Sequence, residues 1–526
     1  MTGLGRPVDS AIFSHPRAQA AIRARRFGVT PSMIEAVALR RAAGDWRGAC
    51  AAAAVEVQID PSSLKARHGS DLAELILDDL RNLSPDLLRW HFPRARHGSG
   101  LLLEDEWVPL ADYAWAGVPV TLVAASPRHA LAAGQRIALT VLAGSRRRDG
   151  TQGPSRRSLT HHRMFWDAAA APQLARLSAD LGGGGTGEPG DARRISALQD
   201  AGRAEQAWAA AGIELICAPA RVSGRRQQAN RISRLATLPV NLPLLVTQAR
   251  ETLPGVDRGA IAFRGGALVL RGLGSDGGPV TAEVVSPEQA RDLPALPDAA
   301  WLRPVDAELL RLDLLAPPDL HPLVADALAP RTSPTSPNQG PATGTLLYRT
   351  VPYFEAVEAC DGAGPGDGDG DGAASQLVLL VRCGTNLHRV AWRDGRWQAE
   401  HDEHGARELL LNRLGGAMDP CRQAAEYLGT GRHILDLVES LLEHGRIHEV
   451  LRLLPEHADA GADPLSFALS DGTTVGESLE ALFLRTAYLR ARAGEAEPPA
   501  AVSYRLANPS LRRRPRKGEP ARTRKR

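Results

Sequence analysis

The chain has 526 residues, 43% of them hydrophobic and 23% charged, and a net charge of +3, as expected for a globular protein of roughly two to four domains. Its 63 basic residues include only three lysines. Lys65, the one outside the last ten residues, fits no motif of a P-loop NTPase, a protein kinase, a Schiff-base enzyme or an SxxK acyl-enzyme. Arginine keeps its proton near neutral pH and cannot replace lysine there, so these enzyme classes are excluded.

Residues 1–97 predict a helical domain, because apolar residues recur at helical spacing and a Pro, Ser, Thr or Asp stands near each start. The segment from Leu39 to Cys50 has the pattern of a helix, a turn at Gly44 and a second helix, which is similar to half of a tetratricopeptide repeat. No second copy follows at the period of that repeat, so we expect an isolated helical hairpin. The expected helices are Pro16–Phe27, Pro31–Ala43, Asp45–Ala53 and Asp71–Leu83.

Residues 98–329 predict a mixed α+β domain, because short runs rich in Val, Ile and Leu alternate with stretches of helical periodicity. The expected strands are Trp107–Leu110, Val118–Ala124, Arg136–Leu142, Ile213–Cys217, Ala260–Phe263, Ala267–Arg271 and Val280–Val285. The expected helices are Phe165–Asp180, Arg194–Ala211, Arg225–Arg234 and Leu244–Thr252.

The rest of the chain begins with a linker at residues 330–344, where Pro, Ser, Thr and Gly leave little apolar surface to bury. Residues 345–400 predict a β-hairpin segment with an acidic, Gly-rich insert at 361–374. Residues 401–495 predict a helical domain, and 496–526 a disordered basic tail. The whole fold is therefore expected to be α+β and multidomain, with helical ends around a mixed middle. The expected strands are Leu346–Val351, Leu377–Cys383, Leu387–Arg393 and Arg396–Glu400.

Two glycine-rich segments copy the beginnings of known binding motifs. Gly272 to Gly277 reads GxGxxG, but Pro279 and a strand-like run follow where a dinucleotide site needs a helix, so we interpret it as a hairpin loop. Asp367, Asp369 and Asp371 resemble the start of a calcium loop, whose last ligand would fall on Val378. The sequence predicts no cofactor and no specific cation site.

Cysteine and histidine side chains leave two further chemistries open. Cys383, His388, His401, His404 and Cys421 have zinc-ligand side chains, but their spacing fits no zinc motif, so no metal site is predicted. A nucleophilic Cys/His pair stays an alternative, because such partners meet in space rather than in sequence. The five cysteines are otherwise interpreted as small buried hydrophobic residues. No secretory leader and no apolar run long enough for a membrane span stands out, which predicts a cytoplasmic protein without membrane contact.

Basic residues gather in three stretches. The first includes Arg156, Arg157 and Arg163 ahead of Phe165 and Trp166, and residues 215–250 contain six arginines without an acid. Both are solvated surfaces in the simpler interpretation and phosphate-contacting surfaces in the other. The tail has nine basic residues and one acid, while the chain before it is net acidic. We expect the tail to contact nucleic acid or an acidic protein through Arg512, Arg513, Arg514, Arg516, Lys517, Arg522, Arg524, Lys525 and Arg526.

The segments 44–50, GDWRGAC, and 86–94, DLLRWHFPR, resemble stretches of uncharacterised proteins of high-GC bacteria. Some of those proteins accompany AAA+ ATPases and von Willebrand A-type proteins. The resemblance brings no catalytic residue and no assigned activity, and it implies a protein partner. Three functions follow as hypotheses: a non-catalytic cytoplasmic adaptor, a nucleic-acid-associated protein without sequence preference, and an enzyme that depends on a metal or a cysteine.

Overall fold

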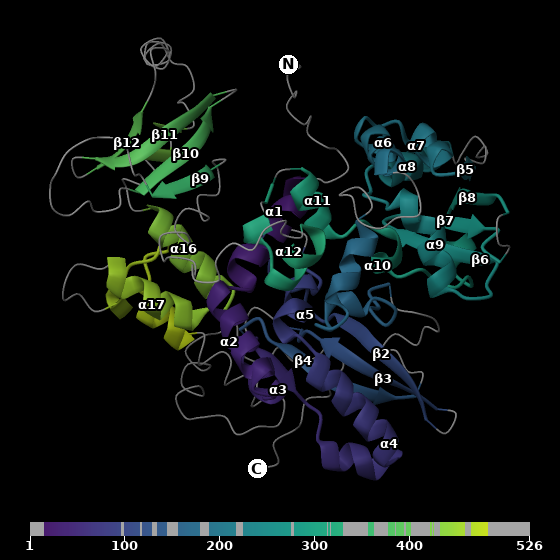
Figure 1. Ribbon diagram of the computed structural model, residues 1–526, viewed down its shortest axis with the longest axis horizontal. Helices are drawn as coiled ribbons and strands as arrows, with labels where there is room; N and C mark the ends of the chain where they lie inside the picture. Colours follow the sequence, from purple (N-terminus) through teal and green to yellow (C-terminus); the bar gives the residue numbers. More distant parts are fainter. Residues whose placement is uncertain are drawn as a thin grey trace, which may run out of the picture. The chain divides into compact units, whose positions relative to one another are not determined.

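The computed structural model describes residues 15–95, 99–115, 118–128, 134–144, 156–178, 189–216, 225–274, 278–329 (without 313 and 316), 356–361, 377–383, 386–393, 396–400, 421–425 (without 423), 432–457 and 464–481. The chain forms two compact units, residues 1–128 with 136–342, and residues 129–135 with 343–526. Helices and mixed sheets occur in the first unit, and the second adds a β-sheet and helices (Figure 1). The predicted α+β class is confirmed.

The chain begins with the predicted helices α1 (His15–Arg23), α2 (Pro31–Ala42) and α3 (Trp46–Ala52). A π-helical segment, η1 (Ala24–Gly28), continues α1. The next helix, α4 (Pro61–Asn82), starts ten residues before the predicted one, because Asp60 caps its first turn through Ser63 and a kink at Gly69 joins two helical pieces. A short helix, α5 (Pro85–His91), was not predicted.

The first sheet has the strand order β1-β4-β3-β2. The strands β2 (Trp107–Trp115), β3 (Val118–Ala125) and β4 (Ile137–Ala143) are antiparallel neighbours and match predicted strands. The short strand β1 (Val55–Val57) pairs in parallel with β4 and was not predicted, since it is only three residues long. The sheet therefore joins residues on both sides of position 97.

The predicted helix at 165–180 is wrong for the described residues. Residues 163–177 form two 3₁₀ segments, η2 (Arg163–Phe165) and η3 (Ala171–Leu177), separated by a turn. Asp167 explains the break, because its side chain accepts hydrogen bonds from the Ala169 backbone and from Arg163, which compete with a continuous helix.

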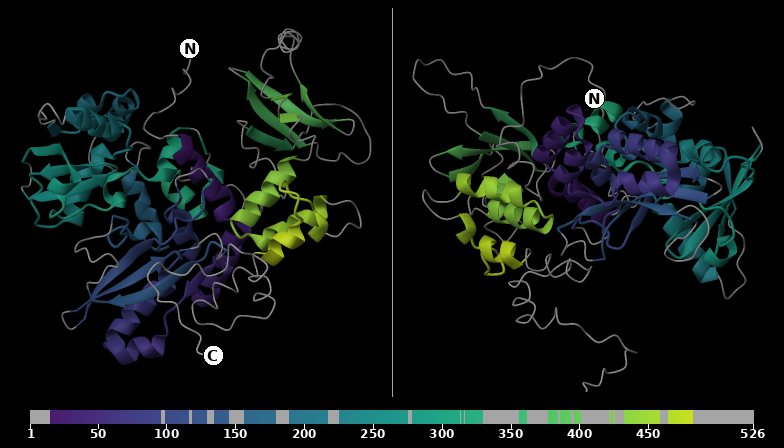
Figure 2. Two further views of the ribbon diagram at one scale, coloured as in Figure 1. Left: turned by 180° about the vertical axis from the view of Figure 1, so that it is seen from behind. Right: turned by 90° about the horizontal axis from the view of Figure 1, so that it is seen from below.

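The middle of the chain repeats the order of elements seen at its start. Here α6 (Pro189–Asp200) and α7 (Ala204–Ala210) lead into β5 (Ile213–Ile216), and α8 (Arg225–Ala236) and α9 (Leu242–Thr252) follow. The strands β6 (Arg258–Phe263), β7 (Gly266–Arg271) and β8 (Val280–Val285) complete a sheet of order β5-β8-β7-β6, with β5 parallel to β8. We call α2 to β4 the first module and α6 to β8 the second module (Figures 1 and 2).

The repeat extends to single backbone positions. The number of residues between the starts of α2, α3 and β1 is the same as between the starts of α6, α7 and β5. Gly44 and Gly202 have φ of 73° and 71° in the turns between the paired helices, and Ala54 and Gly212 have φ of 53° and 72° just before the parallel strands. The hairpin at 39–50 is therefore not isolated. A strand follows each pair of helices, so the pairs do not stack as tetratricopeptide repeats do.

The expected hairpin loop at GxGxxG is confirmed at its two ends, because β7 and β8 pair antiparallel on either side of it. Gly272 takes φ of 81°, and a Cβ there would lie 2.7 Å from the Pro279 carbonyl oxygen. The glycine is needed for this close approach of two strands.

Residues 298–329, which we call the return segment, leave the second module and end beside the first. They contain α10 (Asp298–Trp301), α11 (Val305–Arg311), the 3₁₀ turn η7 (Pro317–Asp319) and α12 (Pro322–Leu328). Trp301 is fully buried in the core of the second module, and α12 packs on η3. The predicted α+β middle thus contains a connecting segment that touches both modules.

The second unit contains an antiparallel sheet of order β12-β11-β10-β9. The strands β10 (Leu377–Cys383), β11 (Asn386–Arg393) and β12 (Arg396–Glu400) were predicted, and β9 (Ala356–Asp361) was not. The helices α16 (Arg432–Glu443) and α17 (Ile447–His457) are separate, and Gly445 lies between them with φ of 69°.

The linker 330–344, the expected strand Leu346–Val351, the acidic insert around Asp367, Asp369 and Asp371, and the tail lie outside the described residues, except that Asp361 ends β9. No helix in the described part of the chain combines the length and apolar character needed to cross a lipid bilayer.

Candidate functional site

The largest concentration of buried charge lies around α11, a helix of only seven residues. Asp306 and Glu308 are 0% and 1% exposed, and Arg303, just before the helix, is 5% exposed. Burying an ion costs several kcal/mol unless a partner compensates it, so each of these groups must be paired. Asp306 contacts the first module and η1, while Arg303 contacts Gln199 of α6 in the second module and also pairs with Glu308.

Asp306 accepts two hydrogen bonds and lies beside a histidine. The Arg25 Nε atom of η1 donates to Asp306 Oδ1 at 2.6 Å, and the Trp90 indole N–H of α5 donates to the same oxygen at 3.1 Å. His91 Nδ1 lies 3.7 Å from Asp306 Oδ2. The Arg25 guanidinium also lies over the Trp90 ring, 5.3 Å from its centroid. One carboxylate thus joins η1, α5 and α11.

The protonation of this network follows from its burial. Burial alone would raise the pKa of Asp306, but the charge and hydrogen bond of Arg25 outweigh it and hold that pKa below its usual range. Burial lowers the pKa of His91 to about 3, and Asp306 only partly opposes this effect. His91 is therefore a neutral imidazole near pH 7 beside an ionised carboxylate.

A second Asp–His pair lies next to Trp90, whose ring centroid is 5.7 Å from that of His321. His321, just before α12, contacts Asp86 Oδ2 through Nε2 at 2.9 Å, and its Nδ1 accepts from the Leu323 backbone N–H at 3.2 Å. Because Nδ1 is an acceptor, Nε2 carries the proton and donates it to Asp86. Ser84 Oγ donates to Asp86 Oδ1 at 2.7 Å rather than to the histidine. The three residue types of a catalytic triad are present, but no imidazole nitrogen faces the serine.

Arg89 of α5 is 0% exposed and contacts main-chain carbonyls. Its Nε donates to Gly28 O at 2.9 Å, and its Nη1 lies 3.4 Å from Ala53 O. These carbonyls end η1 and the α3 turn, so one guanidinium ties two helix C-termini to α5. The segment DLLRWH thus supplies Asp86, Arg89, Trp90 and His91 to the interior of the first module.

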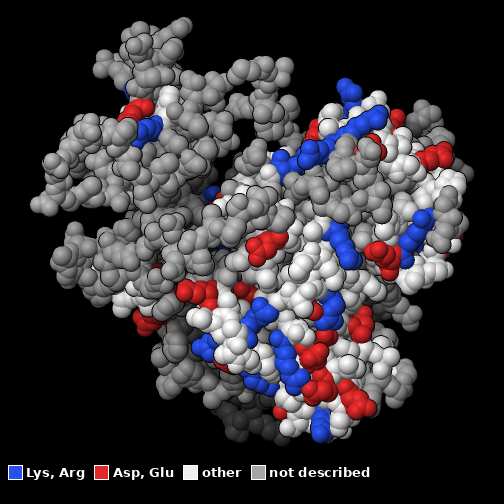
Figure 3. Space-filling model, viewed as in Figure 1, with Lys and Arg blue, Asp and Glu red and all other residues white. Residues whose placement is uncertain are grey.

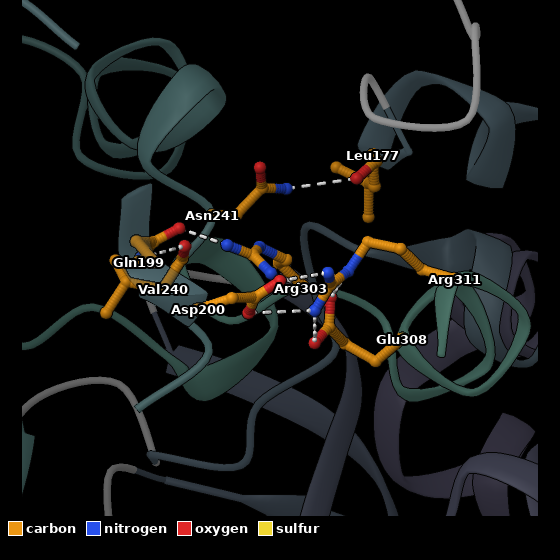
Figure 4. Close-up of polar contacts among 8 residues, drawn as sticks. All are labelled: Leu177, Gln199, Asp200, Val240, Asn241, Arg303, Glu308 and Arg311. Carbon is orange, nitrogen blue, oxygen red and sulfur yellow. Dashed lines mark hydrogen bonds and ion pairs between the residues drawn. The ribbon is translucent and has the colours of Figure 1, made fainter. Parts of the chain in front are cut away.

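Figure 4 shows the cluster on the other side of α11. Arg303 Nη1 donates to Glu308 Oε1 at 2.9 Å, and Arg311 binds both Glu308 oxygens at 3.0 and 2.9 Å. Arg311 also forms a two-bond contact with Asp200, the last residue of α6. Arg303 donates to Gln199 as well, and the Gln199 amide donates to Val240 O.

Burial is the largest single influence on the pKa values of this cluster, but its charges and hydrogen bonds together outweigh it. Burial would raise the pKa of Glu308, but Arg303 and Arg311 lower it overall. Burial would lower the pKa of Arg311, but Glu308 and Asp200 raise it. The neighbouring recess has a volume of about 10 Å³, close to what one water molecule needs by this measure. It is lined by Leu177, Ser178, Asn241, Arg303, Ala307, Glu308 and Arg311.

These contacts form a joint that holds η1, α5, α6 and α11 together. Asp86, Asp306 and Glu308 each face an arginine or a histidine, which compensates the charge of each buried carboxylate. Sequence reasoning did not identify these residues. DLLRWH was noted only as a resemblance, and the signal that could have singled it out is three ionisable residues within a short segment of strong apolar character.

The described part of the arginine stretch before Phe165 and Trp166 has buried aromatic rings and paired arginines. Trp166 is 0% and Phe165 7% exposed, so neither ring can stack on a base. Arg163 lies over Trp166 and is paired with Asp79 and Asp167, and Arg156 is paired with Asp298. These side chains hold turns in place, which agrees with the simpler interpretation of the stretch. Phosphate contact by its arginines stays a prediction.

The arginines of residues 215–250 divide between two places. Arg250 of α9 donates to the carbonyls of Leu273 and Gly272, at 3.1 and 3.5 Å. Arg231 and Arg234 of α8 instead contact the turn between β6 and β7, where Arg231 Nε lies 3.4 Å from Gly265 O and Arg234 Nη1 3.0 Å from Arg264 O. The two α8 residues thus stay together, and Arg250 does not belong to their surface.

The cysteine and histidine candidates are brought together only in part. His388 of β11 and Cys421 are buried, with Nδ1 and Sγ 3.5 Å apart, while His401 and His404 lie outside the described residues. Cys383 ends β10. Within the described residues no three His, Cys, Asp or Glu side chains are grouped as metal ligands would be. Cys50 is buried in α3, and burial raises the pKa of its thiol to about 12, which makes it unreactive.

The nine basic tail residues predicted as a contact site, from Arg512 to Arg526, lie outside the described residues, so this site stays a prediction. Comparison of the chain with protein-family models, with curated proteins and with solved structures finds no match.

Proposed function

We propose that the chain is a non-catalytic adaptor, in which the return segment joins two related modules and the α2–α3 hairpin binds a protein partner. The observation that carries the proposal is the exposed side of this hairpin. Leu39 of α2 is 67% exposed, more than any other large hydrophobic side chain of the described residues. A leucine so exposed is most easily explained by a partner when other contact-forming groups lie beside it.

Such groups follow at the start of α3. The Arg47 guanidinium lies 4.5 Å from the centroid of the half-buried Trp46 ring. Tryptophan and arginine are the residue types that most often dominate protein interfaces. Asp45 caps α3 through the Gly48 N–H at 2.8 Å and pairs with Arg40 at 2.9 Å, which fixes the turn that presents them.

The second module supports the proposal by contrast. In the equivalent hairpin α6–α7, the positions of Leu39, Trp46 and Arg47 are taken by Ala197, Ala204 and Glu205. The hairpin geometry does not need a large apolar residue there, since α6–α7 forms without one. The side chains of the first module are thus available for a partner.

The experiment is affinity purification of the full-length tagged chain from its native cell, with quantitative mass spectrometry of the recovered proteins. We expect a protein recovered at near-stoichiometric amount by the unaltered chain to be lost with Leu39→Asp. Leu75→Asp is the matched control, because Leu75 is a 59% exposed leucine on α4. The sequence resemblance names AAA+ ATPases and von Willebrand A-type proteins as the partners to look for first. Equal recovery with both variants would reject the hairpin as the partner surface.

A further inference from the structure

We infer that the surface of α8 and of the turn between β6 and β7 binds the phosphate backbone of nucleic acid without regard to base sequence. We call this surface, formed by Arg231, Arg234 and Arg264, the α8 surface. The inference goes beyond the adaptor function and does not depend on it. It rests on three observations: the contacts of these arginines, the composition of α8, and the contrast with α4.

The hydrogen bond of Arg234 orients its charge without neutralising it. Arg234 Nη1 donates to the carbonyl of Arg264, and Arg231 Nε lies near that of Gly265. A carbonyl acceptor holds a guanidinium in place but carries no net charge. Arg264 is exposed, and the structure gives it no ion pair among the residues it describes. The remaining N–H donors of a guanidinium fit the two oxygens of a phosphate.

Two glycines in the turn between β6 and β7 leave room for the side chains of Arg231 and Arg234. Gly265 has φ of 77°, and a Cβ there would lie 2.2 Å from Arg234 Nη1. A Cβ on Gly266 would lie 3.2 Å from Arg231 Cγ and 2.6 Å from the Phe263 ring. The two glycines therefore allow the side chains of α8 to lie directly against the turn that carries Arg264.

The composition of α8 favours phosphate over other anions. The helix reads RRQQANRISRLA and contains four arginines, three amide side chains and a serine, without an acid. These are the side chains that contact phosphates and sugars in protein–nucleic acid complexes. Phe263, the nearest aromatic ring, is 5% exposed, so no ring is available to stack on bases and binding is expected to ignore sequence.

Glu288 lies near Arg231 of the α8 surface. The Ser286 hydroxyl chiefly, and the charges of Arg231 and Arg291 in addition, hold the pKa of Glu288 below its usual range. Glu288 is therefore ionised near neutral pH and offsets one of the neighbouring arginines. The charges of Arg234 and Arg264, which are both exposed, carry the proposed binding.

The equivalent helix of the first module is different. Acidic and basic side chains are interspersed on α4, as Figure 3 shows, with Glu74 and Arg81 paired at 2.6 Å. The fold therefore does not require a purely basic helix at this position. The absence of acids from α8 distinguishes the second module and calls for a ligand.

The test must separate the α8 surface from the basic tail. We would use a full-length chain in which the nine basic residues from Arg512 to Arg526 are replaced by glutamine, here named the tail-neutral chain. Binding to a short labelled DNA duplex is followed by fluorescence anisotropy between about 50 and 200 mM salt, because each phosphate contact adds about 0.9 to the slope of log K against log salt. Into this chain we introduce Arg264→Gln, because the Arg264 side chain makes no hydrogen bond or ion pair with the residues that the structure describes. We also introduce the double variant Arg234→Gln/Arg264→Gln.

We expect the tail-neutral chain to bind the duplex, Arg264→Gln to weaken binding about three- to tenfold at the lowest salt, and the double variant to lower the slope by about two. Arg234→Lys/Arg264→Lys keeps the charges and should retain most of the slope. The matched control is Arg67→Gln/Arg176→Gln, which removes two exposed arginines elsewhere.

Three results would overturn the inference. The first is a tail-neutral chain that does not bind the duplex, and the second is a double variant that binds as tightly as its parent. The third is competition by polyglutamate as effective as by unlabelled DNA at equal charge, which would indicate an acidic protein instead. None of these results bears on recovery of a partner by Leu39, so the adaptor proposal stands or fails separately.

Discussion

The two modules of the first unit have the same order of elements and the same order of strands, yet they use their fourth helix differently. In the first module, α5 is buried at every position from Pro85 to Trp90. In the second, α9 buries only one side, through Leu242, Leu245, Ala249 and Thr252. The same place in the fold therefore holds a fully enclosed helix in one copy and an ordinary surface helix in the other.

The return segment accounts for the difference. Pro85 and Pro243 lie in the first turns of α5 and α9, and Leu87 and Leu245 are both fully buried, so the helices correspond position by position. Two residues further on, Arg89 is 0% exposed while Thr247 is exposed. The return segment covers α5 with Asp306 and His321, and this cover lets α5 carry charged residues inside.

Arginine thus has two roles in this chain, and the environment decides which. Inside the joint, Arg25, Arg303 and Arg311 face carboxylates and hold segments together. On the α8 surface, Arg234 faces a carbonyl and keeps its charge available. If this contrast is correct, substitutions in the joint lower stability, and substitutions on α8 affect binding.

The largest effect is expected for Asp306→Ala, which leaves the buried Arg25 and the Trp90 N–H without their acceptor. Removing one partner of a buried ion pair typically costs about 3–5 kcal/mol of unfolding free energy. Denaturant unfolding of the full chain measures the loss. The exposed Asp292→Ala should change stability by less than about 0.5 kcal/mol. A loss below about 1 kcal/mol for Asp306→Ala would mean that the return segment does not hold α5 through this carboxylate.

A smaller loss is expected for Arg303→Gln on the other side of α11. Glu308 keeps its two bonds to Arg311, while the contacts of Arg303 with Glu308 and Gln199 are lost. We expect about 2–3 kcal/mol in the same unfolding experiment. A loss as large as that of Asp306→Ala would show that Arg311 alone cannot compensate the buried Glu308.

The buried histidines predict a loss of stability in weak acid. Burial lowers the pKa of His91 to about 3 and that of His162 to about 4. An unfolded imidazole takes up a proton below about pH 6.5, whereas the folded one does not until pH 3 to 4, so stability rises with pH through this window and levels off above it. The lowered carboxylate pKa values act with the same sign, but only below about pH 5.

Between pH 6.5 and 5, each such histidine should change the unfolding free energy by about 1.5 kcal/mol. His91→Asn keeps a polar group near Asp306 and should reduce this pH dependence by that amount, as measured by denaturant unfolding at several pH values. His68→Asn on α4, outside the network, is the control. An unchanged slope in His91→Asn would show that His91 is protonated in the folded chain.

Much of the fold could be predicted from the sequence, because most strands and helices have clear periodicity. The exceptions have physical reasons. β1 is three residues long and is defined by its pairing with the distant β4. The segment η3 has the composition of an α-helix. The Asp167 side chain accepts a hydrogen bond from the Ala169 backbone just before it, and this bond competes with a continuous helix. The repeat of the two modules was hidden because equivalent positions such as Ala54 and Gly212 share a backbone conformation and not a side chain.

The joint could not be predicted, because its partners come from distant parts of the chain. Arg25 and Asp306 are 281 residues apart, and Asp86 and His321 are 235 apart. A charged residue in a sequence is normally expected to be exposed. The charged residues of α5 are buried because the return segment covers this helix. The basic character of α8, by contrast, is local and was visible in the sequence, although Arg250 had to be removed from the group.

The smallest effect on stability is expected for Arg234→Gln, which makes the same change as Arg303→Gln on the α8 surface. Its hydrogen bond to the Arg264 carbonyl is solvent-exposed, and a glutamine amide can donate to the same turn or leave the carbonyl to water. We expect less than about 0.5 kcal/mol in denaturant unfolding. In DNA binding by the tail-neutral chain, the order of the two effects should reverse. Arg234→Gln should weaken binding, whereas Arg303→Gln should leave it unchanged at temperatures where that variant is folded. A variant series in which stability and binding fall in parallel would mean that the α8 arginines only support the fold, as the buried ones do.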